Sequence, residues 1–145
     1  MNFDLAAVDT TASEDGVYME VKDTAGSPVK NSKGEVPAIK LLGLDSKTYR
    51  DYQRRFVLRR IRRESTKGKP GVIDMTVEEQ AAESEKDMLD QLVMMTVGWK
   101  NFRDDKGAHI TFTPEAAREL YTKYPIVAEQ VDMFCASRAN FMRHP

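Results

Sequence analysis

Few side chains in this sequence of 145 residues have types suited to catalysis: two histidines, His109 and His144, and one cysteine, Cys135. A cysteine nucleophile needs a nearby imidazole, or another group that lowers its pKa. Cys135 instead falls on the apolar side of a helical pattern, where a free cysteine is usually a small core residue. We therefore predict a buried, unreactive cysteine and a protein that is not an enzyme.

Two adjacent carboxylates, Asp104 and Asp105, have oxygen atoms suited to a hard cation. A metal site, however, needs three or four ligands with recognisable spacing. Two aspartates followed by Gly107 are typical of a tight turn. The glycine patterns GxxxxGK[ST] and GxGxxG of phosphate-binding loops do not occur. We predict no catalytic residue, no metal and no cofactor.

A basic helix between Lys47 and Arg63 is the strongest candidate for a binding function. Residues 46–69 carry 10 basic and 2 acidic side chains, whereas residues 70–90 carry 1 basic and 7 acidic ones. We favour a face that is solvated or paired with those acids; a charged protein partner is the next hypothesis, and nucleic acid is the least favoured. The arginines of this charged face are Arg54, Arg55, Arg59, Arg60, Arg62 and Arg63.

Length and composition favour one soluble domain, since a chain of this size buries about two-thirds of its unfolded surface. A single cysteine excludes an internal disulfide and fits a reducing compartment. Residues 1–15 are acidic and lack the features of a secretory signal. No apolar run approaches the roughly 20 residues that a membrane span requires, so we expect no membrane association.

The pattern of apolar residues predicts an α+β fold that is mainly α, with a small N-terminal antiparallel sheet followed by about four helices. Val17 to Lys22 alternates with the two-residue period of a half-buried strand, and Val36 to Leu42 forms a second extended run. We expect a flexible arm at 1–15 and a single domain at 16–145. The expected parts of that domain are a β part (16–44), the basic helix (45–64), a linker (65–75) and a helical module (76–145).

Each expected helix has a recognisable start. Asp45 or Ser46 suits the N-cap of the basic helix, and Thr76 with Glu79 forms a capping box. Thr113 and Pro114 start a third helix, which we expect to end at Tyr124, and Pro125 starts a fourth. The side chains expected to face inward are Tyr49, Tyr52, Phe56, Val57 and Ile61 on the first helix, Val77, Ala81, Met88, Leu92 and Met95 on the second, Ala117, Leu120, Tyr121 and Tyr124 on the third, and Val127, Val131, Phe134, Cys135, Phe141 and Met142 on the fourth.

The stretch from Val97 to Phe141 is the most characteristic part of the sequence. We expect Gly98 and the only tryptophan, Trp99, to end the second helix. A tight turn at 104–107 and a short extended piece ending at Phe112 should then lead into the third helix. These features together predict a module whose residues serve packing and turn formation rather than catalysis.

In the order of these features the chain resembles the tail assembly chaperones of long-tailed phages. The segments Gly16–Val21, Ile39–Gly43 and Tyr49–Arg55 are similar as well, so the resemblance covers roughly Gly16 to Phe141. It implies a non-catalytic protein that binds the tape measure protein and tail tube subunits. Such a protein acts in the host cell cytoplasm and is absent from the mature virion, and self-association is an open alternative.

The role implied by the resemblance requires an apolar groove that accepts an amphipathic helix. Flexible thioether and aromatic side chains suit such a surface, although the same residue types also fill cores. The candidate partner-binding residues are Met88, Leu92, Met95, Trp99, Phe102, Phe134 and Phe141. Two other functions stay open: a head–tail connector or tail-completion subunit of the virion, and a nucleic-acid-binding protein that uses the basic helix.

Overall fold

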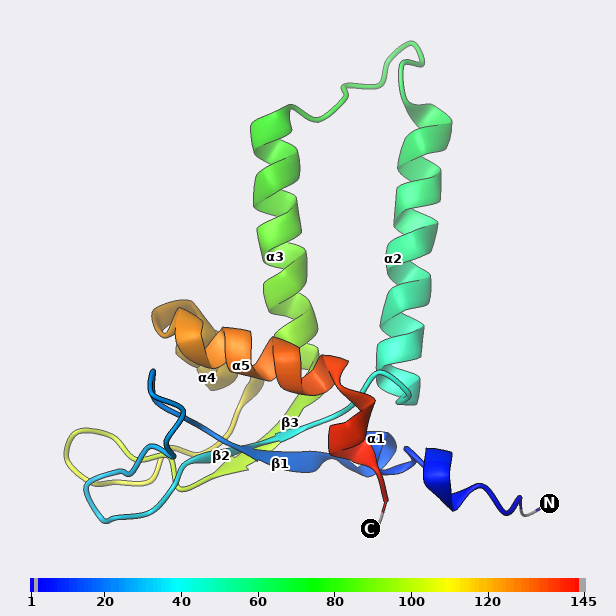
Figure 1. Ribbon diagram of the computed structural model, residues 1–145. Coiled ribbons are helices and arrows are strands. Elements are labelled where there is room, and N and C mark those ends of the chain that lie inside the picture. The colour runs from blue at the N-terminus through cyan, green and yellow to red at the C-terminus, as the bar shows by residue number, and fades with distance from the viewer. Residues whose placement is uncertain (2, 144–145) are drawn as a thin grey trace.

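The structure is a computed structural model that describes residues 1 and 3–143. It has the expected α+β composition, with five α-helices and a three-stranded antiparallel sheet among the described residues (Figure 1). The elements in chain order are η1 (Ala6–Val8), α1 (Ala12–Asp15), β1 (Val17–Glu20), β2 (Ala38–Leu41), α2 (Lys47–Thr66), α3 (Val77–Met95), β3 (Thr96–Lys100), α4 (Pro114–Lys123), α5 (Pro125–Ala136) and η2 (Arg138–Phe141).

We expected the sheet to be confined to the N-terminal part, but it also includes a strand from the second half of the described chain. Its order is β1-β2-β3, and β3 follows α3 directly, so the two long helices are inserted between the second and third strands. The expectation that Gly98 and Trp99 end a helix is therefore wrong. The helix ends at Met95, and Trp99 pairs with Ile39 of β2, a strand distant in sequence.

The two faces of the sheet have different surroundings. Met19 pairs with Ile39, and both side chains are buried in the core. The helices α4 and α5 lie on one side of the sheet (Figure 1). Tyr18, which alternates with Met19, is 44% exposed, and the ammonium group of Lys100 lies 4.3 Å from the centre of its ring. This alternation confirms the two-residue period that the sequence showed.

The helices that cover the sheet begin where local signals placed them. The Thr113 hydroxyl accepts a hydrogen bond from the Ala116 amide at 3.0 Å, and Pro114 occupies the first turn of α4. Tyr124 is exposed rather than inward-facing, because it lies at the junction between α4 and α5, where its backbone is not helical. The core residues that these helices and η2 supply are Ala117, Tyr121, Val127, Val131, Cys135 and Phe141.

We expected residues 1–15 to form a flexible arm, but residues 10–15 are folded against the domain. Ser13 in α1 is only 2% exposed, and its carbonyl accepts a hydrogen bond from the Gly43 amide at 3.1 Å. The Glu14 carboxylate accepts from the Lys47 amide at 2.7 Å. The sequence of this segment has little apolar periodicity, so only these distant contacts reveal its attachment.

Three tight turns share one hydrogen-bonding pattern, and they include the turn expected at 104–107. In each, a side-chain Oδ1 accepts from the amides two and four residues later, and a glycine three residues later has positive φ. A positive φ favours glycine because it has no Cβ. The turns begin at Asp23, Asn31 and Asp104 and contain Gly26, Gly34 and Gly107.

Candidate partner-binding surface on the α2–α3 projection

Helices α2 and α3 run side by side away from the sheet, and residues 67–76 join their far ends (Figure 1). We call residues 47–95 the α2–α3 projection. The Ser46 hydroxyl caps α2 by accepting from the Tyr49 amide at 3.2 Å. Thr76 and Glu79 form the expected capping box at the start of α3.

The projection exposes apolar side chains that we expected to be buried. None of the 20 residues of α2 is buried: Val57 and Ile61, which we expected to face inward, are 38% and 56% exposed, and Leu58 beside them is 43% exposed. On α3, Val77 and Met88 are 76% and 58% exposed, while Leu92 and Met95 near its base are in the core. A single apolar stripe on α3 therefore starts in the core and continues uncovered along the projection.

Polar contacts join the two helices. The Tyr52 hydroxyl donates to the Asp87 carbonyl at 2.9 Å, and the Arg59 guanidinium lies 2.6 Å from the Asp87 carboxylate. Arg63 lies 2.5 Å from the Glu83 carboxylate. The hydrogen bond to Asp87 raises the pKa of Arg59. Pairing with acids inside the chain, the interpretation that we favoured, is thus confirmed for Arg59 and Arg63.

The other arginines of the charged face have no such partner. Within the described part of the chain, Arg54, Arg60 and Arg62 form no ion pair, and all three are exposed. An Arg55 Nη atom lies 4.0 Å from the Met94 sulfur. Partly exposed ion pairs contribute only about 0–1 kcal/mol each. The basic surface is therefore weakly neutralised and available to a charged partner.

A groove runs between the two helices on each side of the projection. One side, which we call the Met88 groove, carries no charge apart from Asp87, and its six other lining residues are neutral or apolar. The opposite side is lined by two arginines and two aspartates, together with apolar side chains. The lining of the Met88 groove consists of Tyr52, Gln53 and Phe56 from α2 and Ser84, Asp87, Met88 and Gln91 from α3.

Three of the expected partner-binding residues belong to the core instead. Leu92, Met95 and Phe141 are 3%, 1% and 0% exposed, so their assignment to a partner surface is wrong. Leu92 and Met95 belong to the core cluster that the sheet shares with α4 and α5. Met88 is the one expected residue that lines the groove.

The three remaining expected residues are half-buried aromatic rings. Trp99 stacks on Phe102 with ring centres 4.6 Å apart, and its indole N–H donates to the Ile110 carbonyl at 2.8 Å. The Phe134 ring contacts the Phe141 ring edge-on, with centres 5.5 Å apart. These rings pack against the core cluster, and none of them lines the Met88 groove, so the structure does not combine them with Met88 into one site.

The helical spacing of Phe56, Val57 and Ile61 led us to expect burial, but Val57 and Ile61 are exposed and Phe56 lines the groove. Leu58, which the sequence did not single out, is exposed as well. A usable signal was present, however. Arginines flank this apolar stripe on both sides, and arginines are rarely buried without partners. That density of charge indicates a helix that lies at the surface of the folded chain.

The residues with chemical reactivity do not come together. Cys135 is 4% exposed and burial raises the pKa of its thiol to about 12, which confirms the expected core role. His109 is exposed on a loop, and His144 lies outside the described residues. Among residues 1 and 3–143, no group of three or more potential metal ligands is found.

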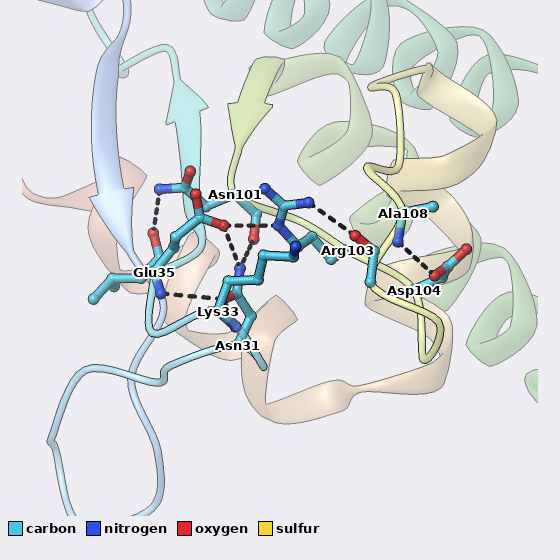
Figure 2. A network of polar contacts seen from close by, with 9 residues as sticks. Asn31, Lys33, Glu35, Asn101, Arg103, Asp104 and Ala108 are labelled. Carbon is cyan, nitrogen blue, oxygen red and sulfur yellow. Dashed lines mark hydrogen bonds and ion pairs between the residues drawn. The ribbon is translucent and has the colours of Figure 1, made fainter.

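A second polar cluster joins the loop between β1 and β2 to the loop after β3 (Figure 2). The Arg103 guanidinium donates to Glu35 and to the Gly107 carbonyl, both at 2.8 Å. Asn31 donates to Glu35 at 3.0 Å and to the Asn101 carbonyl at 2.9 Å. The hydrogen bonds from Arg103 and Asn31 lower the pKa of Glu35. These side chains satisfy one another and hold the two loops together.

Comparison of the chain with protein families, with curated proteins and with solved structures finds no match. None of the helices within the described residues has the length and apolar character needed to cross a membrane.

Proposed function

We propose that this protein is a tail assembly chaperone of a long-tailed phage, which binds the tape measure protein and tail tube subunits and catalyses no reaction. The proposal includes action in the host cytoplasm and absence from the finished virion. The resemblance from Gly16 to Phe141 supports it at the level of sequence. The observation that carries it is the uncovered Met88 groove on a projection of two long helices.

The groove has the composition that an amphipathic client helix requires. Phe56 and Met88 provide apolar contact from opposite walls, and the amides of Gln53 and Gln91 provide hydrogen bonds beside them. A methionine adapts its shape to different apolar side chains, so one groove accepts successive segments of a long client. The exposed arginines of α2 attract acidic client residues and mainly affect the rate and selectivity of binding.

The shallow form of the groove fits a chaperone that must release its client. Met88 is 58% exposed, and Val77 further along the same stripe is 76% exposed, so neither lies in a deep pocket. Small interfaces without deeply buried anchors bind weakly, because the loss of translational and rotational freedom offsets most of the gain. Weak binding allows release when the tail tube assembles around the tape measure protein.

Co-expression with the tape measure protein of the same phage tests the proposal. The full chain is expected to keep the tape measure protein soluble and to co-purify with it. Met88→Glu, which places a charge in the groove, should abolish that effect. Met133→Glu is the matched control, because Met133 is 74% exposed on α5, outside the groove. The proposal fails if the wild-type chain forms no complex with either the tape measure protein or the tail tube subunit.

A connector or tail-completion subunit predicts a different fate for the protein. It would be a fixed part of finished particles and would appear in mass spectra of purified virions. A chaperone would be absent from those spectra.

The arginines without ion pairs, Arg54, Arg60 and Arg62, favour nucleic-acid binding as a second candidate function. Binding through several phosphates should be tight at low salt and should weaken steeply as salt rises. A salt titration with duplex DNA measures this, and no affinity at about 50 mM salt would remove the candidate.

A further inference from the structure

The α2–α3 projection leaves unusually much of its own surface uncovered. A helix of 20 residues is about 30 Å long, and α2 buries none of its residues. In water, such a helix gains most of its stability from packing of an apolar face rather than from intrinsic propensity. The polar contacts made by Tyr52, Arg59 and Arg63 join the pair of helices but leave Val57 and Ile61 in solvent. A further helical surface would supply the missing cover.

The two helices of the projection have opposite charge, and much of it is unpaired. The basic surplus of residues 46–69 lies on α2 and the residues beside it, and the acidic surplus of residues 70–90 lies on and before α3. Among the residues that the structure describes, neither Arg54 nor Arg60 on α2 forms an ion pair, and the same holds for Glu78 and Glu85 on α3. The exposed surface of the projection therefore has complementary charges, with unpaired positive charge on α2 and unpaired negative charge on α3.

Helical geometry places these charges beside apolar side chains. Tyr52, Arg59 and Arg63 face α3, and at 100° per residue Arg54 and Ile61 fall on the opposite side of α2. Val57 lies between that outer side and the side that carries Gln53, which lines the Met88 groove.

The same geometry applies to α3, where Asp87 faces α2. Glu78 and Glu85 fall on the opposite side of α3, and Ala81 lies between them and Met88. Each helix thus has apolar side chains next to unpaired charges: Val57 and Ile61 beside arginines on α2, and Ala81 and Met88 beside glutamates on α3.

We propose that two copies of the free chain pair through their projections, with α2 of each copy against α3 of the other. The resulting four helices cover both Met88 grooves, and the arrangement is a symmetric dimer in which the same patch is used twice. A second copy fits better than a partner of one charge, because it presents both signs in the required order. The proposal concerns the protein without a client and does not depend on the identity of that client.

Charge reversal tests this pairing directly, with association measured by sedimentation velocity. One variant carries Arg54→Glu and Arg60→Glu, and the other carries Glu78→Lys and Glu85→Lys. All four side chains are exposed, so both variants should fold, which circular dichroism would check. Each variant alone should dimerise at least tenfold more weakly than the wild type, because both helix–helix contacts then join like charges.

Mixing the two variants is the decisive step. In the mixed dimer, the reversed α2 meets the reversed α3, and the two unchanged helices meet each other, so association should return to the wild-type level. Met133→Glu on α5 should dimerise as the wild type does. The proposal is overturned by a wild-type chain that is monomeric at roughly 100 μM, by an assembly larger than a dimer, by one that nuclease dissolves, or by a mixture that associates no better than its components.

Discussion

The hydroxyl groups of Thr96 and Tyr121 lie 2.6 Å apart in the core and join the start of β3 to α4. Thr96 donates its proton to the Leu92 carbonyl at 2.7 Å, so Tyr121 is the donor in the bond between the two hydroxyls. Burial raises the pKa of Tyr121 far above its ordinary value, which keeps the phenol protonated. This chain of bonds satisfies every polar side-chain atom of the pair.

Thr96→Val should therefore destabilise the protein by about 1–3 kcal/mol, because it leaves the buried Tyr121 hydroxyl without a partner. Tyr121→Phe should cost less, since Thr96 keeps its bond to Leu92. Urea unfolding measures both. The double variant should cost less than the sum of the two single variants; equal costs for the two single changes would contradict the assigned direction of the bond.

Gly43→Ala should be destabilising, by about 1–3 kcal/mol, because it overfills a packed site. A Cβ at this position would lie 2.4 Å from the Ser13 hydroxyl and 2.9 Å from the Phe141 ring. Gly98→Ala is the control, since the nearest atom to the added Cβ would be the Cβ of Lys40, at 3.9 Å. Thermal unfolding of both variants measures the difference, and similar midpoints would refute the packing argument.

Two neighbouring aspartates in one turn should respond differently to alanine. Asp104 accepts hydrogen bonds from the Lys106 and Ala108 amides, both at 2.9 Å, and Figure 2 shows the bond from Ala108. Asp105 makes no ion pair or side-chain hydrogen bond among the described residues. Asp104→Ala should cost about 1 kcal/mol, and Asp105→Ala should cost almost nothing. Denaturant unfolding gives both values, and the reverse order would contradict the turn geometry.

Acid should weaken the protein partly through Asp45. Hydrogen bonds from Arg138 and Thr10 lower the pKa of this carboxyl below its ordinary value of 3.8. A carboxyl with a lowered folded-state pKa stabilises the fold above its unfolded pKa, and this contribution is lost as the pH falls through the folded value. The loss should begin near pH 4 and continue below it.

Unfolding free energies of the wild type and of Asp45→Asn at pH 7 and pH 3 measure this effect. The variant should be less stable at pH 7 and should lose less stability on acidification. Asp105→Asn serves as the control and should follow the wild type. An unchanged acid response in Asp45→Asn would exclude Asp45 as a source of the pH dependence.

The Cys135 thiol should be unreactive in the folded protein. It is 4% exposed, and burial raises its pKa to about 12, so almost no thiolate is present near neutral pH. A thiol reagent at about pH 8 should label the chain slowly without denaturant and fully in denaturing urea. Fast stoichiometric labelling of the native protein would show that the thiol is accessible.

The sequence predicts a structural feature correctly where the interacting atoms are close in sequence. The caps at Ser46, Thr76 and Thr113 and the turn at Asp104 need only a few neighbouring residues, so their side-chain oxygens predict them. The burial of Cys135 followed from its position on a strongly apolar helix face. These features depend on hydrogen bonds and periodicity that the order of residues already contains.

Burial and strand pairing depend on contacts between distant segments, and there the sequence was insufficient. Thr96–Lys100 is a strand because β2 offers an edge to it. The stripe of α2 that includes Val57 and Ile61 is exposed because no element within the described part of the chain covers it. The apolar spacing of a helix shows that one face can be buried. Whether it is buried depends on which other elements the chain places against it.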